Sequence, residues 1–338
     1  MRIALDAMGG DLGPSVNVRG AVEACKEWSD LEVILVGNRA KLMEELKSFK
    51  LNSNSRLNVH HADEIVGMEE SPVEACRSKP DSSIMVCAKL VAEGKADGLV
   101  SAGNSGATMT ASLLHLRRLE GISRPAIATV LPTLNGHCVM LDMGANMDCK
   151  PKHLLQFAVM GSVYFQAMFK KQSPTIGLLS IGEEEGKGNE LTLETHMLLK
   201  NSGLNYIGNI EGRDIPMGKA DVIVCDGFVG NVVLKFGEGL AEAIIKLMKK
   251  EMMGHPVAML GGLLVKSVLR KIKKKVDPAE YGGAPLLGVQ GISIVSHGGS
   301  NDFAIKNALR VGVELIHDNI NMHIDKQLKS TSQSIVLA

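Results

Sequence analysis

The residues of this chain that could do chemistry lie in short turns of glycine and polar side chains. The fullest turn, DGFVGN at 226–231, follows β-branched residues 222–224 and precedes apolar residues at helical spacing. Such a strand–turn–helix unit points backbone N–H groups toward the carboxyl end of a sheet, where anions bind in open α/β folds. Asp226, Gly230 and Asn231 are therefore candidate site residues. The alternative is an ordinary turn in which glycine only permits the bend.

The same pattern recurs along the chain, in GNSG at 103–106, in GAN at 144–146 and in HGGSN at 297–301. In one parallel sheet such turns meet at a single edge, so we expect one cleft rich in N–H donors that suits phosphate. The phosphate-binding candidates from these turns are Gly103, Asn104, Ser105, Asn146, Asp226 and Gly230.

Two cations at other strand ends are candidates to offset the charge of a bound phosphate. Lys187 lies in the loop IGEEEGKG at 181–188, and Arg213 lies in the polar cluster that follows the strand expected at 206–210. His297 opens a glycine turn after a buried strand, where it either serves the site or merely caps a helix.

Motifs of several other chemistries are missing from the sequence. It has no GxxxxGK[ST] phosphate loop, no GxGxxG dinucleotide fingerprint and no GxSxG nucleophile elbow. Adjacent residues on a strand point to opposite faces, so His60 and His61 do not predict a metal site. We expect no metal and no cofactor, and direct attack by a bound substrate rather than a covalent enzyme intermediate.

Short β-branched segments alternate with amphipathic helices through most of the 338 residues, which predicts an α/β fold. We expect a three-layer α/β/α architecture with a mostly parallel sheet, as one large domain over 1–328. Asn135 and Gly136 predict a hairpin between the strands at 127–131 and 138–142. The last residues, 329–338, have the composition of a flexible tail.

Composition limits the classes of partner. The formal net charge is zero and aromatic residues are only 3% of the chain, so nothing favours nucleic acid. The six cysteines form no CxxC pair, which is typical of reduced thiols in a cytoplasmic protein. The first residues contain no apolar signal segment and no run of about 18 apolar residues occurs, so we expect neither export nor a membrane span.

One segment differs from the rest, a helical excursion at about 237–277 whose part 256–276 is basic and amphipathic. No acidic residue stands between Glu251 and Asp277. Such a helix is typical of a membrane interface, but it could also cover a partner, lie in a dimer interface or remain a plain surface helix. The candidate membrane-surface residues are the apolar Leu260, Leu264 and Val268 and the basic Lys266, Arg270, Lys273 and Lys274.

Six ordered blocks together resemble one family over residues 1 to about 325. They are MRIALDAMGGDLGP at the start, SAGNSGA at 101–107, LDMGAN at 141–146, GNIEGRDI at 208–215, DGFVGNVVLK at 226–235 and GGAPLLGVQG at 282–291. The chain is similar to the bacterial phosphate acyltransferases of phospholipid synthesis. Members usually carry Thr where Ser105 stands here, and the hydroxyl is kept.

The resemblance implies that acyl-acyl-carrier-protein and inorganic phosphate give acyl phosphate and free acyl carrier protein. It implies a fold like that of phosphotransacetylase and isocitrate dehydrogenase. It also implies a homodimer at the inner face of the cytoplasmic membrane, near the glycerol-3-phosphate acyltransferase that uses the product. The basic face of 256–276 would contact anionic membrane, the acidic carrier protein or both.

In the mechanism that we expect, phosphate sits among the turn N–H groups and attacks the thioester carbonyl. Lys187 and Arg213 offset its charge, Asn231 or Asn104 donates to the developing oxyanion, and His297 orients a group or moves a proton. A metal-dependent hydroxy-acid dehydrogenase on the same scaffold and a non-enzymatic membrane-surface protein are the alternatives.

Overall fold

The structure is a computed structural model that describes residues 1–49, 56–254 and 256–337. Within its helices, the side chains of 256, 257, 259, 260, 262, 263, 273, 276 and 332–337 lie outside the described part, so the candidates Leu260 and Lys273 do too. The strands are β1 (Arg2–Asp6), β2 (Glu32–Gly37), β3 (Leu57–His61), β4 (Gly98–Ser101), β5 (Ala126–Ile127), β6 (Thr129–Thr133), β7 (Gly136–Leu141), β8 (Ile176–Leu179), β9 (Tyr206–Ile210), β10 (Val222–Val224), β11 (Ala284–Leu287) and β12 (Ile292–Val295). The helices are α1 (Pro14–Glu27), α2 (Arg39–Lys47), α3 (Pro72–Ser78), α4 (Ser83–Ala92), α5 (Ser105–His115), α6 (Pro151–Phe169), α7 (Glu190–Lys200), α8 (Gly227–Met253), α9 (Pro256–Val276), α10 (Pro278–Tyr281), α11 (Asp302–His317) and α12 (Ile320–Leu337), with a short 3₁₀ turn at Gly212–Asp214.

The first sheet contains seven strands in the order β3-β2-β1-β4-β12-β11-β5. Strands β1, β2, β3, β4 and β12 pair in parallel, and β11 runs antiparallel to both of its neighbours. Apart from the exposed Arg2 at the start of β1, the residues of the central strands β1, β4 and β12 are buried, as expected for strands covered by helices on both sides. The carboxyl ends of β1, β4 and β12 therefore lie at one edge of this sheet.

The second sheet contains five strands in the order β6-β7-β10-β8-β9. Strands β6 and β7 form an antiparallel hairpin in which Thr133 pairs with Gly136, which confirms the hairpin predicted at Asn135 and Gly136. Strands β7, β10, β8 and β9 pair in parallel. Their carboxyl ends lie at one edge, and the turns that follow them carry most of the candidate site residues.

The two sheets are joined by β5 and β6, which are separated by Ala128 alone. Strand β5 is antiparallel to β11, which is itself antiparallel to β12, so β5 and β6 run in the direction of the first sheet's parallel strands. Strand β7 is antiparallel to β6 and begins the opposite direction. Consequently, the parallel strands of the two sheets end at opposite edges.

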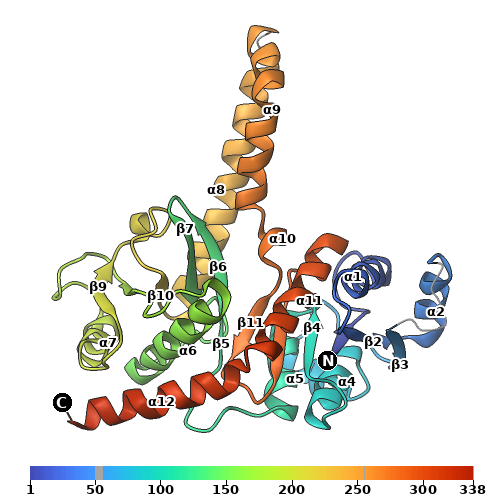
Figure 1. The fold of residues 1–338 in the computed structure, drawn as a ribbon, viewed down its shortest axis with the longest axis horizontal. Coiled ribbons are helices and arrows are strands. Elements are labelled where there is room, and N and C mark those ends of the chain that lie inside the picture. Colours follow the sequence, from blue (N-terminus) through green and yellow to red (C-terminus); the bar gives the residue numbers. More distant parts are fainter. Residues whose placement is uncertain (50–55, 255, 338) are drawn as a thin grey trace.

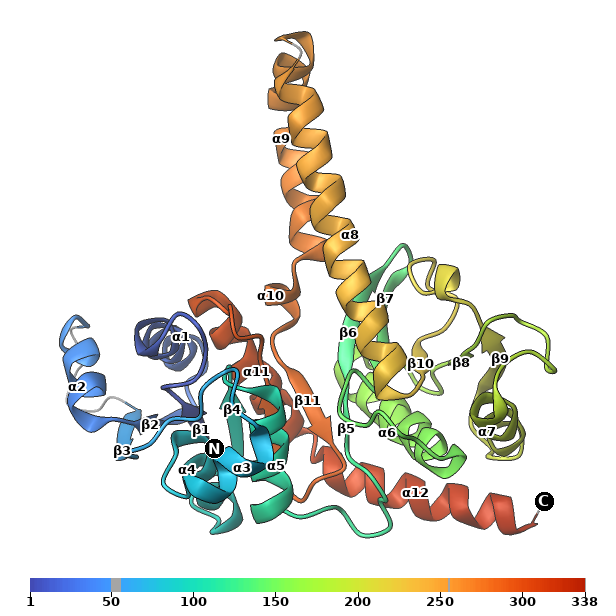
Figure 2. The same cartoon turned by 180° about the vertical axis from the view of Figure 1, so that it is seen from behind.

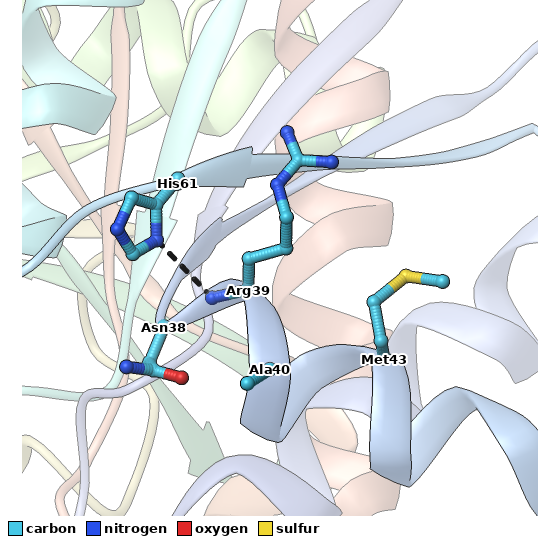
Figure 3. A pocket seen from close by; sticks show the side chains of 5 residues that line it. All are labelled: Asn38, Arg39, Ala40, Met43 and His61. Atoms are coloured by element: carbon cyan, nitrogen blue, oxygen red, sulfur yellow. Dashed lines mark hydrogen bonds between the residues drawn. The ribbon is translucent and has the colours of Figure 1, made fainter.

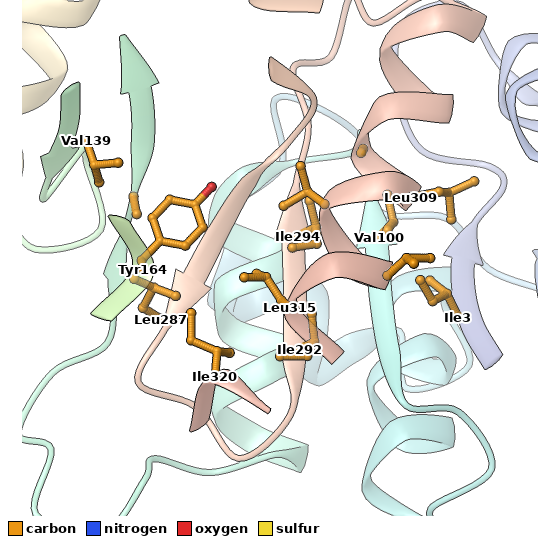
Figure 4. Close-up of a cluster of buried hydrophobic side chains, with 14 of the residues drawn as sticks. Ile3, Val100, Val139, Tyr164, Leu287, Ile292, Ile294, Leu309, Leu315 and Ile320 are labelled. Carbon is orange, nitrogen blue, oxygen red and sulfur yellow. The ribbon is translucent and has the colours of Figure 1, made fainter. Parts of the chain in front are cut away.

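The buried side chains form a core that continues from one sheet to the other (Figure 4). Ile3, Val100 and Leu287 lie on the first sheet and Val139 lies on the second. Ile320 of α12 belongs to the same core. The expected α/β fold with mostly parallel strands is confirmed, although the strands divide into two sheets. Residues 329–337 continue helix α12, so this segment is helical rather than irregular.

Helices α8 and α9 form a long hairpin that projects from the two-sheet body (Figures 1 and 2). Its base lies at the second sheet, where α8 begins directly after β10. Apolar side chains that are exposed follow α8 at steps of three or four residues, and they are Val232, Phe236, Leu240, Ile244 and Leu247. Among the described residues, no helix combines the length and the apolar character that crossing a membrane requires.

The first turn of α8 fits tightly against the turn that follows β7. A Cβ atom at Gly227 would lie 2.7 Å from the carbonyl oxygen of Asn146, and one at Gly230 would overlap the carbonyl oxygen of Asp142. Backbone cannot move aside as a flexible side chain can, so these two positions require glycine. This contact fixes where α8 starts and therefore where Asn231 lies.

We predict that Gly230→Ala destabilises the protein by about 2 kcal/mol or more, because the added methyl group must displace the backbone of Asp142. The matched control is Gly237→Ala on the same helix, where a Cβ would meet nothing within 4 Å. That change should be neutral or stabilising by about 0.5–1 kcal/mol, because alanine favours a helix interior. Thermal or urea unfolding measures both variants, and equal effects would contradict the tight contact.

Candidate functional site

A buried carboxylate, Asp142, organises the turn after β7. It is fully buried and accepts hydrogen bonds from the backbone N–H groups of Ile127 at 3.0 Å, Ala145 at 3.2 Å and Asn146 at 2.6 Å. The side-chain amide of Asn146 donates to it as well, at 2.8 Å. Burial raises the pKa of Asp142, while these donors oppose the rise. Because its side chain is completely buried and bonded to the turn, Asp142 shapes the turn.

Asn146 completes the seat of helix α8. Its amide donates to the carbonyl oxygen of Pro125 at 2.7 Å as well as to Asp142, and its own carbonyl oxygen accepts from Gly227 N–H at 2.8 Å. Asp226 caps α8 by accepting from Val229 N–H at 2.9 Å. Asn146 and Asp226 are therefore occupied by structural bonds, and any contribution that they make to a phosphate site is indirect.

Asn231 is exposed just beyond this seat, one residue after Gly230. A Cβ built on Gly144 would lie 3.5–3.7 Å from the Cβ, Cγ and Oδ1 atoms of Asn231, which places the amide over the glycine turn. The side chain makes no hydrogen bond to any residue that the structure describes. Asn231 thus has a free amide at the carboxyl edge of the second sheet.

Lys187 and Arg213 follow β8 and β9 at the same edge, because these strands are parallel to β7 and β10. Lys187 is exposed, and its ammonium forms no ion pair within the described part of the chain. Arg213 is also exposed, with 75% of its side chain accessible, but it pairs with Glu211 at 2.8 Å. Lys187 is available to an anion as it stands, whereas Arg213 must first exchange its carboxylate partner.

The second group of candidates lies at the opposite edge, in the turns that follow β4 and β12. Gly103 packs beside Asp6, whose carboxylate accepts from Ser101 Oγ at 2.7 Å and from Gly9 N–H at 3.1 Å. Burial raises the pKa of Asp6, and its hydrogen bonds oppose the rise. Ser101 Oγ in turn accepts from Gly103 N–H at 3.0 Å. This cluster has the same design as that of Asp142, with a buried carboxylate under a glycine turn.

Asn104 is used by the fold, and this corrects the oxyanion role expected for it. Its Oδ1 caps helix α5 by accepting from Ala107 N–H at 3.1 Å. Its Nδ2 donates to the carbonyl oxygens of Met68 at 3.0 Å and Glu70 at 3.1 Å, which ties the 67–70 segment to the helix. The neighbouring Ser105 is exposed at the first position of α5.

His297 is exposed, and its Nδ1 accepts from Gly299 N–H at 3.0 Å within its own turn. Strand β12 pairs with β4 in the first sheet, so His297 belongs with Gly103 and not with Asn231. No hydrogen bond or ion pair of the described residues joins the two groups. The expectation that all these turns meet at one edge is therefore wrong, because the two sets of parallel strands run in opposite directions.

Two pockets on the surface of the described residues lie away from the candidate residues. One is lined by Asn38, Arg39, Ala40, Met43 and His61 where α2 begins (Figure 3). The other lies between α6 and α12, with Lys170 and His323 among its lining residues. Among the described residues no group of three or more His, Cys, Asp or Glu side chains could hold a metal ion.

The sequence pattern pointed to the turns but missed the two carboxylates beneath them. Asp6 and Asp142 each stand at a strand end directly before a glycine-containing turn. Their signal was therefore present, but it became readable only once several N–H groups were seen to converge on each buried side chain.

We predict different effects on stability for Asn104 and Asn231, which the sequence analysis proposed for the same role. Asn104→Ala should destabilise the protein by about 1–2 kcal/mol, because it removes a helix cap and leaves carbonyl oxygens unpaired. Asn231→Ala should leave the unfolding midpoint unchanged, because its amide makes no hydrogen bond to a described residue. Differential scanning calorimetry of both variants measures this, and equal destabilisation would contradict the assignment.

Comparison with known proteins finds relatives over nearly the whole length of the chain. A family model described as "Fatty acid synthesis protein" matches residues 1–323. A phosphate acyltransferase of Desulfitobacterium hafniense (strain DSM 10664 / DCB-2) is 54% identical over 329 residues, which cover 97% of this chain and 98% of that relative. A phosphate acyltransferase of Endomicrobium trichonymphae is 49% identical over 339 residues, which cover 99% of this chain and all of that relative.

Solved structures show the same fold at low sequence identity. A phosphotransacetylase from Streptococcus pyogenes superposes with a TM-score of 0.64 at 19% identity, covering 94% of both chains. The EutD phosphotransacetylase from Staphylococcus aureus gives 0.60 at 17% identity, again with 94% of both chains covered. The expected likeness to phosphotransacetylase is thereby confirmed. The chain is about half identical to the phosphate acyltransferases of Desulfitobacterium hafniense and Endomicrobium trichonymphae over nearly its whole length. It therefore belongs to the fatty acid synthesis protein family, that of the phosphate acyltransferases.

Proposed function

We propose that this enzyme converts acyl-acyl-carrier-protein and inorganic phosphate into acyl phosphate and free acyl carrier protein for phospholipid synthesis. The observation that carries the proposal is identity of about one half to phosphate acyltransferases over nearly the full length of both chains. The edge of the second sheet supports it, because Asn231 and Lys187 there present a free amide and an unpaired cation. No observation favours the dehydrogenase alternative.

In the proposed reaction, phosphate binds at this edge between the start of α8 and the 181–188 loop. Lys187 offsets part of its charge, and Arg213 adds a second cation after it leaves Glu211. Held in this way, a phosphate oxygen attacks the thioester carbonyl carbon, the carbon–sulfur bond breaks and the sulfur leaves as thiolate. A thiol has a pKa of about 8.5, so its thiolate leaves without strong help from a general acid.

Asn231 takes the role of oxyanion donor in this scheme. As the carbonyl becomes tetrahedral, its oxygen gains charge, and a fixed amide donor stabilises that charge more than it stabilises the ground state. The tight seat of α8 on Asp142 and Asn146 holds the donor in place. His297 and the turn at Gly103 have no step in this scheme, because they lie at the opposite edge.

We infer two further surfaces from the α8–α9 hairpin. The exposed apolar stripe of α8 suits a second copy of the chain, because a continuous stripe at steps of three or four residues is the pattern of packed helices, and 68% of Phe236 is accessible in the single chain. Sedimentation at the mass of one chain would rule out this homodimer. Helix α9 offers an amphipathic surface, with Leu264 and Val268 exposed on one side and Lys266 and Arg270 exposed on the opposite side.

The proposed location of the enzyme follows from α9. We propose peripheral attachment to the anionic inner face of the cytoplasmic membrane, where the labile acyl phosphate can pass to the glycerol-3-phosphate acyltransferase. Part of the same basic face could instead dock the acidic carrier protein. Lys274, also on α9, lies 3.6 Å from Glu280, so its charge is partly balanced.

We predict that the purified enzyme forms acyl phosphate from acyl-carrier thioester and phosphate, detected by trapping the product with hydroxylamine. Lys187→Ala should raise the phosphate KM by about tenfold or more, because a hydrogen bond to a charged group contributes about 1.5–3 kcal/mol. The control is Lys41→Ala, an exposed lysine on α2 of the other sheet. An unchanged phosphate KM in the Lys187 variant would remove Lys187 from this role, and absence of product would refute the reaction.

We predict that the enzyme sediments with anionic liposomes in low salt and is released as salt rises, because screening weakens the attraction. Leu264→Glu with Val268→Glu should abolish sedimentation and leave turnover of the soluble thioester unchanged. The matched control adds the same charges at Leu114 and Leu134, which are exposed elsewhere. If the α9 variant instead loses turnover and keeps liposome binding, the face docks the carrier protein.

A further inference from the structure

A buried histidine outside the proposed reaction connects to the loop that carries Lys187. His196 on α7 is 4% exposed, and its Nδ1 lies 2.8 Å from the hydroxyl oxygen of Tyr206 on β9. The two rings meet edge to face with centroids 5.5 Å apart. Burial raises the pKa of Tyr206, so its hydroxyl stays protonated as a donor. Burying the imidazole of His196 is costly unless it is hydrogen-bonded, and the half-buried Tyr206 supplies that bond.

The pair passes on to Asn209, which is 5% exposed at the end of β9. The Tyr206 hydroxyl donates to Asn209 Oδ1 at 3.4 Å, which fixes the orientation of the amide. Asn209 Nδ2 then donates to two carbonyl oxygens of the 181–188 loop, those of Glu184 at 3.0 Å and Lys187 at 3.4 Å. The histidine thus connects, through two side chains, to the backbone of Lys187 itself.

The other nitrogen of the ring faces the same loop. His196 Nε2 is buried and makes no hydrogen bond within the described residues. It lies 3.7 Å from Glu185 Oε1, just beyond hydrogen-bond distance, and that oxygen accepts from Lys200 at 2.9 Å. Because the Tyr206 hydroxyl donates to Asn209, His196 Nδ1–H must donate to the Tyr206 oxygen. In a neutral imidazole Nε2 then carries no proton and cannot donate to the Glu185 carboxylate.

We propose that His196 is a positioning residue for Lys187, acting through Tyr206 and Asn209 on the loop backbone. The network holds two loop carbonyl oxygens, those of Glu184 and Lys187, and it leaves the Lys187 ammonium available to an anion. The inference rests on the proposed role of Lys187 as a phosphate ligand. It adds residues that touch no reacting atom and yet determine where the cation lies.

The proposal predicts an effect on one substrate only. A cation displaced by about 1 Å loses much of its benefit, and losses of up to about 100-fold follow from such displacements in active sites. Tyr206→Phe keeps the ring and removes the hydroxyl that joins His196 to Asn209. We expect it to raise the phosphate KM about tenfold and to leave the thioester KM within about twofold of the parent.

A conservative pair of variants tests His196 directly. His196→Leu removes both nitrogens, whereas His196→Asn keeps an amide at the position of Nδ1 for Tyr206. We expect His196→Leu to raise the phosphate KM and His196→Asn to restore most of it. The matched control is Thr195→Val on the same helix, since that hydroxyl is buried and bonds only to Leu191 of α7 among the described residues. It should leave the phosphate KM unchanged.

Combination with Lys187→Ala separates positioning from general damage. If Tyr206 acts through Lys187, the double variant should have the phosphate KM of Lys187→Ala alone, because the position of a deleted cation no longer matters. Multiplying effects would overturn the proposal, as would an unchanged phosphate KM in Tyr206→Phe. An unchanged KM in Lys187→Ala would overturn both the role of Lys187 and its positioning.

Hydrogen–deuterium exchange gives a readout that needs no turnover. The amides of 181–188 should exchange faster in Tyr206→Phe and His196→Leu than in the parent, and those of α8 should not change. Unchanged exchange in the loop would overturn the inference even if the enzyme forms acyl phosphate. If the loop exchanges faster in the variants but the parent enzyme forms no acyl phosphate, only the proposed reaction is refuted. The two failures are therefore distinguishable.

Discussion

The buried carboxylate of Asp142 is the constraint on which the proposed site depends. It stands where β7 ends and where the two sheets adjoin, and it gathers the N–H groups of Ile127, Ala145 and Asn146. A carboxylate in this position is stable only because protein donors replace its water. The hydrogen bonds that the carboxylate accepts fix the conformation of the turn after β7. The first turn of α8 packs against that turn.

The contact of α8 with this turn determines the position of each part of the helix to which we assign a function. Its first turn fits against the Asp142 backbone because Gly230 has no side chain, and the next residue, Asn231, therefore has a set position. Beyond it α8 leaves the body, so its apolar stripe and the basic face of α9 stay uncovered in the single chain. One helix thus connects the edge where we propose that phosphate binds with the surface that we propose faces a second copy and the membrane.

The sequence by itself determined the local structure and the family. Alternating β-branched segments and amphipathic helices gave the α/β class, and Asn135 with Gly136 gave the hairpin of β6 and β7. The sequence predicted the turns that cap helices because Asn and Asp side chains accept hydrogen bonds from backbone N–H groups only a few residues away. These are short-range effects, decided within a few residues, and the motif blocks that resemble the family are read in the same way.

Only the tertiary structure decided which turns meet. The reversal between β6 and β7 places Gly103 and Asn231 at opposite edges, and no local pattern encodes the direction of a strand relative to a distant sheet. The tertiary structure also showed that the Asn104 amide donates to carbonyl oxygens of the 67–70 segment and that Arg213 forms an ion pair with Glu211. The physical reason is that a polar side chain is available to a ligand only after the whole fold has satisfied its own buried groups.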